Sequence, residues 1–354
     1  MKRRSALSAL VLPLLLAACT GTEDTTPTLT LALLTNGGTT LRTLTPAEDT
    51  AASPLTDVAS QTVSGGVSLD TLPSGRRFAL TLTGGLESRD AKLNAAAFGA
   101  LPFTPCLRQT ATSAARDRLL TLSECEGGPQ RLALYRDDGT LIWTALLPTF
   151  LPVMDPDAPP TRLAVIRDAL EGRDVAVVTR PRLGGGSEVL RAAPLRTGDP
   201  VAEVSVPLPV AAVRDLAPYG SQILAATDSG VQPLRTTGEP DAAAAIKAFG
   251  TERYDRLWTG TAGSRTLVAA WAHNTAASGP LLLWDGARAT AATVTSFVSD
   301  LRDVTITPDG LLYTLTATTL TRYDTVYGLA QGNWRTRTVL STLNDARSVT
   351  WLLP

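Results

Sequence analysis

The feature that most constrains the fold is a loose internal repeat of about 45 residues. Its clearest copy, SDLRDVTITPDGLLYTLTATTLTRYDT (299–325), has three strand-like runs, the first two separated by a Pro-Asp-Gly turn. Short runs of β-branched and apolar residues bounded by turn residues favour strands over helices. Units of this kind bury their apolar faces only by stacking on one another, so an array of small sheets is predicted.

Weaker copies precede this one. The first turns of the six copies fall at Gly75, Asp117, Gly172, Gly220, Gly263 and Gly310. The successive intervals are 42, 55, 48, 43 and 47 residues, and the longest one contains the segment FLPVMDPDAPPT, 150–161. We interpret that Pro- and Asp-rich segment as a surface loop. The pattern therefore predicts six units of four short strands each.

The two ends of the chain supply a seventh unit. The C-terminal NDARSVTWLLP (344–354) aligns with SDLRDVTITP (299–308), so the chain ends on a first strand with no second strand after it. At the N-terminus, residues 29–35 and 39–45 flank an Asn-Gly-Gly turn and predict a hairpin, with 57–63 as an outer strand. Pairing between the termini would close a ring and remove its open edges.

The repeats resemble bacterial seven-bladed β-propellers of the WD40-like or YncE-like type. The resemblance covers roughly residues 28–354 and implies an all-β domain of seven four-stranded antiparallel blades. No Gly-His and Trp-Asp pairs recur in step, which departs from the WD40 pattern. The segment LALYRDDGTLIW (132–143) resembles a tryptophan-docking repeat, in which Trp143 would cap the neighbouring blade. Rings of six or eight blades and a pair of β-sandwiches are the alternatives.

The first 18 residues are predicted to be a lipoprotein signal peptide. Three basic residues precede an apolar run that is shorter than the roughly 20 residues of a membrane-spanning helix. The run ends in Leu16, Ala17, Ala18 and Cys19, which resembles the bacterial lipobox. That resemblance implies cleavage before Cys19 and attachment of diacylglycerol to its sulfur. The alternative is an ordinary signal peptide followed by an incidental cysteine.

Lipidation would place the mature protein in the cell envelope, outside the cytoplasm. Two or three acyl chains anchor a protein stably, whereas a single chain binds only marginally. Residues 19–28 are then a Thr-rich flexible tether, and 29–354 form a single propeller domain. Removing residues 1–18 leaves 29 Lys+Arg against 33 Asp+Glu, a net charge of −4 instead of −1. Such a balance excludes a strongly basic nucleic-acid-binding protein.

The two other cysteines are predicted to form a disulfide. Cys106 and Cys125 flank a predicted hairpin in which residue 112 faces residue 119, so residue 106 faces residue 125. A leftover pair of cysteines outside the cytoplasm favours a bridge, worth roughly 3 kcal/mol for a loop of about 20 residues. Two free buried thiols are the alternative, and the spacing is not that of a C-x-x-C redox pair.

Few residues carry obvious chemistry. The single histidine, His273, lies in a predicted loop, where a lone imidazole is more often a surface residue than a catalytic base. The acidic turns, such as Asp155 with Asp157, lack the ligand series of a calcium loop. We find no phosphate-binding glycine loop and no G-x-S-x-G motif. The sequence therefore predicts no catalytic residue, no metal ligand and no cofactor.

The resulting hypothesis is a non-enzymatic, protein-binding scaffold. Its expected partners are the lipid bilayer, through acylated Cys19, and another envelope protein; no nucleic acid is expected. The alternatives are a hydrolase or lactonase with a calcium-dependent central site, and a propeller that binds a small ligand. Carboxylates and Asn side chains converging on one point of the channel would favour the enzyme, and scattered polar or apolar residues would favour the scaffold.

Overall fold

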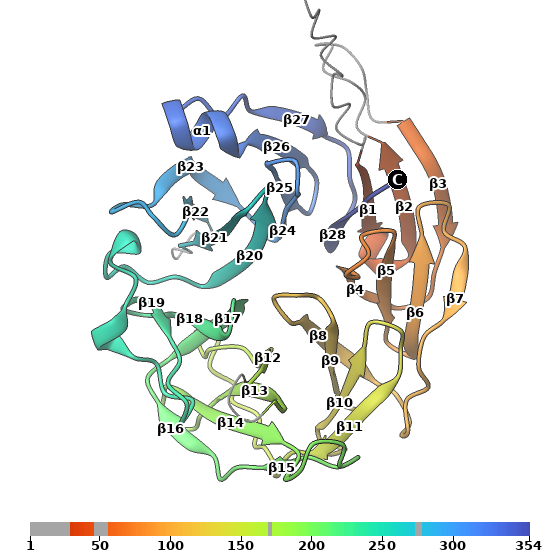
Figure 1. Cartoon of the computed structure of the whole chain (residues 1–354), viewed down its shortest axis with the longest axis vertical. Helices are drawn as coiled ribbons and strands as arrows, with labels where there is room; N and C mark the ends of the chain where they lie inside the picture. Colours follow the sequence, from red (N-terminus) through yellow and green to blue (C-terminus); the bar gives the residue numbers. More distant parts are fainter. Residues whose placement is uncertain (1–28, 46–55, 169–171, 273–277) are drawn as a thin grey trace, which may run out of the picture.

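The seven-bladed propeller is confirmed. A computed structural model describes residues 29–45, 56–168, 172–272 and 278–354, which form seven antiparallel sheets around a central axis (Figure 1). The signal peptide, the lipobox with Cys19 and the single histidine, His273, lie outside these described residues. Within the described ranges, no helix has the length and apolar composition needed to cross a bilayer.

Six blades follow one another along the chain, and each begins with its innermost strand. Blades one and two comprise β4 (Gly66–Thr71), β5 (Arg77–Leu82), β6 (Gly85–Asp90) and β7 (Ala95–Ala97), then β8 (Leu107–Thr112), β9 (Arg118–Ser123), β10 (Arg131–Arg136) and β11 (Leu141–Leu146). Blades three and four comprise β12 (Arg162–Arg167), β13 (Asp174–Pro181), β14 (Ser187–Ala193), β15 (Glu203–Val204) and β16 (Leu208–Val210), then β17 (Val213–Tyr219), β18 (Gln222–Thr227) and β19 (Gly230–Pro233). Blades five and six comprise β20 (Arg256–Ala262), β21 (Arg265–Trp271), β22 (Ser278–Trp284) and β23 (Ala292–Ser299), then β24 (Leu301–Ile306), β25 (Leu311–Thr316), β26 (Leu320–Asp324) and β27 (Arg337–Leu340).

The seventh blade joins the two ends of the chain, as predicted. Its strands lie in the order β28 (Ser348–Leu352), β1 (Thr30–Thr35), β2 (Thr40–Thr45) and β3 (Thr56–Thr62). β28 and β1 are antiparallel, with Thr30 opposite Leu352 and Leu34 opposite Ser348. The inner strands of neighbouring blades contact each other in a closed cycle, so the C-terminal strand completes the ring.

Two blades depart from the predicted four strands. In blade three, β15 and β16 both pair with β14, so the outer position is split between two short strands. Blade four has three strands instead of the predicted four, and the Ala-rich segment 241–249 between blades four and five, predicted from sequence to form one or two helical turns, forms two 3₁₀ turns, η2 (Ala242–Ala244) and η3 (Lys247–Phe249). Alanine favours helical over extended backbone, so this stretch makes a poor edge strand.

The core lies between the blades. Trp143 of β11 is completely buried in a cluster that combines Leu134 of blade two with Leu163, Val165 and Val178 of blade three. This position confirms that the indole packs against the neighbouring blade. One element was not predicted, the short helix α1 (Thr325–Gln331) between β26 and β27.

The inner strand of each blade crosses the ring from one face to the other, and this direction distinguishes the two faces. We call the face where the inner strands begin the entry face, and the face where they end the exit face. The first turns lie on the exit face, with positive φ at Gly75, Gly172, Gly220, Gly263 and Gly310. In blade two the residue with positive φ is Arg116 (φ +60°), one position before the predicted Asp117. β1 begins on the exit face, with Thr30 opposite Leu352.

Candidate functional site in the central channel

The inner strands bring polar side chains into the channel through β-bulges. The pairing register shifts between Gly66 and Ser68 in β4, and in the same way near the start of β8, β17 and β24. A bulge adds one residue and changes the direction of the side chains that follow it. In β17 and β24 the extra residue is an arginine, and the residue after it is Asp215 or Asp303.

Two cavities meet inside the channel. The cavity toward the exit face has a volume of about 320 Å³, and the one toward the entry face about 450 Å³. Both are lined by Asp70, Thr110, Arg256 and Asp303, which therefore mark the middle of the channel. A cavity of this size accommodates a small molecule or several waters.

Asp215 connects three blades. Its Oδ2 accepts hydrogen bonds from the Leu257 amide (2.9 Å) and from Arg256 Nε (3.2 Å), both of blade five. Its Oδ1 lies 2.9 Å from Nε of Arg162 in blade three. This carboxylate is buried and fully engaged in holding the inner strands together.

Asp303 of blade six has the same structural role, because it binds the inner strand of blade seven, which closes the ring. Its Oδ2 accepts from the Val349 amide (2.9 Å) and from Ser348 Oγ (2.8 Å), both of β28. Its Oδ1 accepts from Trp258 Nε1 (3.1 Å) in blade five and from the Val304 amide (2.9 Å). Burial raises the pKa of Asp303, and these hydrogen bonds oppose the rise.

Asp70 is less well satisfied than the other two carboxylates. Its Oδ2 accepts a hydrogen bond from Thr110 Oγ1 (2.8 Å), whose oxygen also lies 2.6 Å from Ser68 Oγ. Burial in the channel raises the pKa of Asp70 to about 6, and the charge of Asp303 adds to the rise, whereas Thr110 and Arg116 lower it. Asp70 therefore changes its charge near neutral pH while facing an open cavity.

The channel does not gather its carboxylates around one point. Within the described ranges, no group of three or more His, Cys, Asp or Glu side chains is placed to hold a metal ion. The acidic residues are instead distributed among the blades, each with its own arginine, hydroxyl or amide donors. The arrangement that would favour a calcium-dependent enzyme is therefore not found in the part of the chain that the structure describes.

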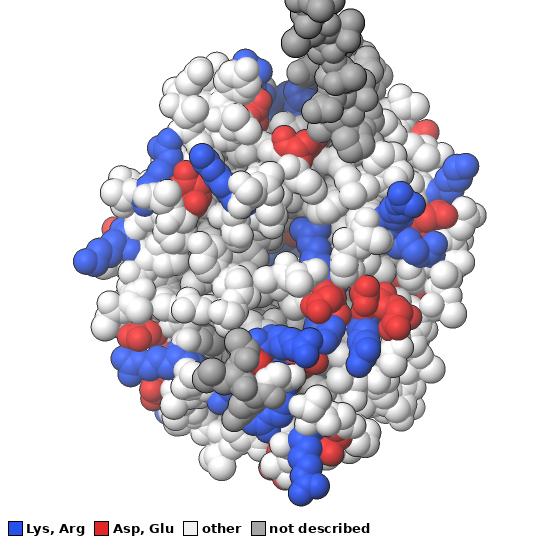
Figure 2. All heavy atoms as spheres, in the orientation of Figure 1, with Lys and Arg blue, Asp and Glu red and all other residues white. Residues whose placement is uncertain are grey.

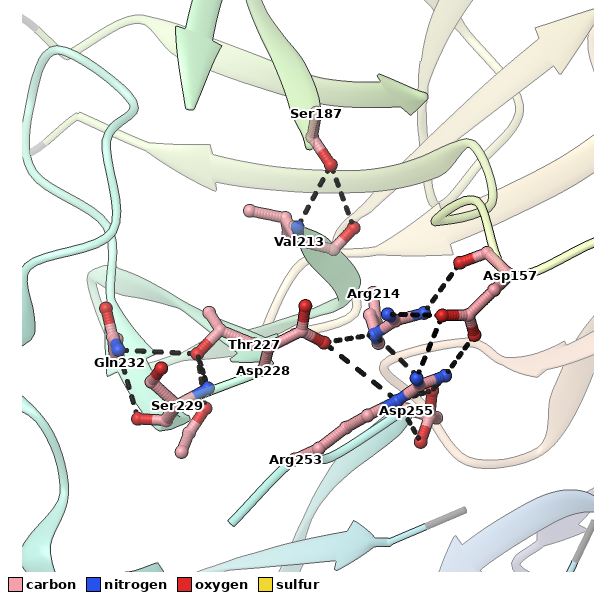
Figure 3. A network of polar contacts seen from close by, with 11 residues as sticks. Asp157, Ser187, Val213, Arg214, Thr227, Asp228, Ser229, Gln232, Arg253 and Asp255 are labelled. Atoms are coloured by element: carbon pink, nitrogen blue, oxygen red, sulfur yellow. Dashed lines mark hydrogen bonds and ion pairs between the residues drawn. The ribbon is translucent and has the colours of Figure 1, made fainter. Parts of the chain in front are cut away.

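A network of charges attaches the loop 147–161 to the entry face (Figure 3). Asp157 of this loop pairs with Arg253 (2.9 Å) and lies 3.6 Å from Arg214 of β17. Both arginines also contact Asp228 and Asp255, at 2.5 and 2.8 Å for the shortest pairs. The hydrogen bond from Arg253 lowers the pKa of Asp157. The loop that lengthens the repeat to 55 residues thus reaches past blade three to the edges of blades four and five.

The predicted disulfide is present between Cys106 and Cys125. The predicted register holds for the pairs from Gln109 with Leu122 to Thr112 with Leu119, and then shifts by one residue at the bulge, where Leu107 faces Ser123. The bridge lies at the entry-face end of β8 and β9 and ties the connection from blade one to blade two.

Charges of both signs are interspersed on the face seen in Figure 2, without a continuous field of one sign. Arginines collect at the entry mouth of the channel, where Arg108, Arg302 and Arg347 line the cavity. Arg302 pairs with Asp300 at 2.8 Å, and Arg347 lies 3.6 Å from Asp345. These pairs partly neutralise the mouth.

Sequence reasoning did not identify the channel residues Asp70, Asp215, Asp303 and Arg116. A partial signal exists, because an Arg-Asp pair begins both β17 and β24 and a related Arg-Ser pair precedes Val349. Read across the repeats, such pairs mark a polar position that recurs at the start of inner strands. Which of these residues meet in the channel depends on the order of the blades around the ring.

No family model and no curated protein matches this chain. Among solved structures, a proposed 6-phosphogluconolactonase from Bacteroides uniformis is 16% identical, with 92% of this chain and 100% of that chain covered and a TM-score of 0.57. A proposed 6-phosphogluconolactonase from Bacteroides fragilis is 13% identical, with 93% and 99% covered and a TM-score of 0.55. Apo AztD from Citrobacter koseri is 11% identical, with 85% and 79% covered and a TM-score of 0.52. Likeness at these identities shows the propeller fold that the chain shares with them.

Proposed function

We propose that this chain is a lipid-anchored envelope propeller whose entry face binds another envelope protein. The observation that carries the proposal is the attached loop 147–161. It is fixed by the Asp157 contacts, yet the side chains of Leu151 and Met154 on it are 65% and 91% exposed. Apolar side chains held on a rigid support are the usual anchors of protein–protein interfaces.

The channel chemistry favours binding over catalysis. Asp215 and Asp303 accept amide hydrogens of the next blade, so moving them for acid–base or metal chemistry would break the contacts between inner strands. The calcium-dependent hydrolase or lactonase is the weaker candidate because its ligand cluster is not found among the described residues. The WD40-like or YncE-like character of the repeats is retained as part of this proposal, since such rings commonly serve as binding platforms.

The direction of the anchor supports the choice of face. The tether would join the ring where β1 begins, on the exit face. Acylated Cys19 would therefore hold the exit face toward the bilayer and leave the entry face, with its loop and disulfide, accessible to partners.

The anchor is tested by changing Cys19 to Ala and following the protein in membrane and soluble fractions of the cells that produce it. We expect the variant to lose its membrane association and its acyl chains by mass spectrometry. Thr20→Ala is the matched control, because it changes the neighbouring residue and keeps the cysteine. An acyl-free Cys19 in the unaltered protein would rule out the lipid anchor.

The binding face is tested with a photo-crosslinking amino acid at position 154. We expect one defined envelope protein to be captured, and the double change Leu151→Asp with Met154→Asp to weaken recovery of that protein at least about tenfold without altering the melting temperature. Val326 of α1 is 62% exposed and lies beside the exit-face residue Gly310, so the same crosslinker there is the control. Equal capture from both positions would contradict the assignment of the face.

A further inference from the structure

Arg116 occupies a position where equivalent turns use glycine. In blades one, two and six the first turn closes with the same hydrogen bond, from the amide of Gly75, Arg116 or Gly310 to the carbonyl three residues earlier. The φ angles at the three positions are +69°, +60° and +86°. A residue with a Cβ atom is disfavoured at such angles, whereas glycine adopts them freely. Blade two therefore tolerates a conformational cost at Arg116 that the other two turns avoid.

The strained backbone directs the Arg116 side chain into the channel. The guanidinium carbon lies 4.6 Å from the centre of the Trp351 ring, and the side chain lines the cavity on the exit side. Nη1 of Arg116 is buried without a hydrogen-bond partner in the protein, and burial lowers the pKa of Arg116 while the charge of Asp70 opposes this. A buried donor of this kind is normally satisfied, so it is suited to receive an anionic acceptor from a ligand.

The rest of the cavity offers acceptors and hydroxyls. Asp70 faces the same space and interacts electrostatically with Arg116 without forming an ion pair, which leaves room between the two groups. Thr112, Thr261 and Thr266 also line the wall. A ligand with one negative group and several hydroxyls would match the Arg116 cation opposite a carboxyl and a threonine-rich surface, since Arg256, the other arginine of this cavity, is paired with Asp215.

We propose that the exit half of the channel binds a small polyhydroxylated monocarboxylate, a sugar acid, with its carboxylate on Arg116 and its hydroxyls toward Asp70 and the threonines. The cavity of about 320 Å³ is of the size that such a molecule needs. A phosphate dianion fits less well, because Asp70 and Asp303 would repel its second charge and, with Arg256 already paired to Asp215, Arg116 alone would bind it. The site is independent of the proposed protein-binding face.

Calorimetric titration of the purified mature domain with D-glucuronate tests the proposal, with D-gluconate and D-galacturonate as further probes. D-Glucose is the neutral analogue of glucuronate, and acetate is a carboxylate without hydroxyls. We expect at least one sugar acid to bind at least about tenfold more tightly than glucose or acetate, a difference of about 1.4 kcal/mol. The proposal is wrong if none of the three acids binds at about 10 mM, or if inorganic phosphate binds as tightly.

The decisive variant is Arg116→Gly, which removes the cation and relieves the backbone strain. We expect an unchanged or higher melting temperature together with a loss of sugar-acid binding of at least about tenfold. Arg335→Gly is the matched control, because Arg335 also has positive φ (+43°) and stacks on an aromatic ring, that of Tyr327, away from the channel cavity. A lower melting temperature with undiminished binding in Arg116→Gly would show that Arg116 is only a structural residue.

Discussion

Asp303 and Asp70 project from inner strands of the same ring into the same channel, and their surroundings differ. Asp303 accepts four hydrogen bonds, from the two neighbouring blades and from its own strand. Asp70 has fewer donors: it accepts a hydrogen bond from the Thr110 hydroxyl, and the Ser68 hydroxyl makes a smaller contribution. The comparison teaches that the inner strands of one ring can hold a structural carboxylate directly after the bulge in one blade and a less satisfied, titrating carboxylate two residues farther along the strand in another. The number of donors around each group distinguishes the two cases.

The largest effect is expected from Asp303→Ala. The change leaves the amide of Val349 and the indole N–H of Trp258 without their acceptor in a largely buried setting, so we expect a loss of about 3 kcal/mol in the free energy of unfolding. Urea denaturation of the mature domain measures this loss. A change below about 0.5 kcal/mol would show that Asp303 is not a structural carboxylate and that it does not differ from Asp70 in the way proposed.

In contrast to Asp303→Ala, the change Asp70→Asn is expected to increase the free energy of unfolding. The folded-state pKa of about 6 lies above the ordinary 3.8, so the folded protein retains a proton that the unfolded chain releases as the pH rises from about 4 to 6. Stability therefore falls through that window, and the full penalty of ionising Asp70 is present at pH 8. Two pKa units correspond to nearly 3 kcal/mol, which channel water reduces to an expected gain of about 1–2 kcal/mol for the variant.

This second prediction is checked by denaturation at pH 4 and pH 8. We expect only a small difference at pH 4, where Asp70 is protonated in the folded state and about half ionised in the unfolded state, and a clearly more stable variant at pH 8. Asparagine also retains an acceptor for Thr110. A variant that is less stable at pH 8 would place Asp70 with Asp303, as a second structural carboxylate.

The smallest effect is expected at Asp157, which has several partners but is exposed. Its side chain is 67% accessible, so water screens its pairs with Arg253 and Arg214. We expect Asp157→Ala to change the free energy of unfolding by less than about 1 kcal/mol and to increase hydrogen exchange in the loop 147–161. A loss as large as that of Asp303→Ala would mean that the number of partners matters more than burial.

Much of the fold could be predicted from sequence because it is repeated. The offset between 344–354 and 299–308 predicted the closing blade, and the turn spacing predicted the number of blades. The disulfide followed from the register of a single hairpin. Bulges such as the one between Leu107 and Gln109 could not be predicted, because one extra residue leaves the alternation of short strands almost unchanged.

The channel site was less predictable for a different reason. Asp70 and Arg116 come from different blades, and nothing local to the segments VSLD (67–70) and SAARD (113–117) indicates that they share a cavity. The strained turn was misplaced by one residue, since Asp117 is the more usual turn residue and Arg116 has the positive φ. A residue that departs from the preference of its position is best recognised once the backbone is known.

The pairing of β28 with β1 also sets the order of events during synthesis. β1 is among the first strands to leave the ribosome, and its partner Ser348–Leu352 is the last. Until then, the apolar edge of Thr30–Thr35 has no neighbour on that side and is open to pairing with other chains. A chain interrupted near its C-terminus would keep that edge exposed. Such incomplete molecules would be prone to aggregation or proteolysis.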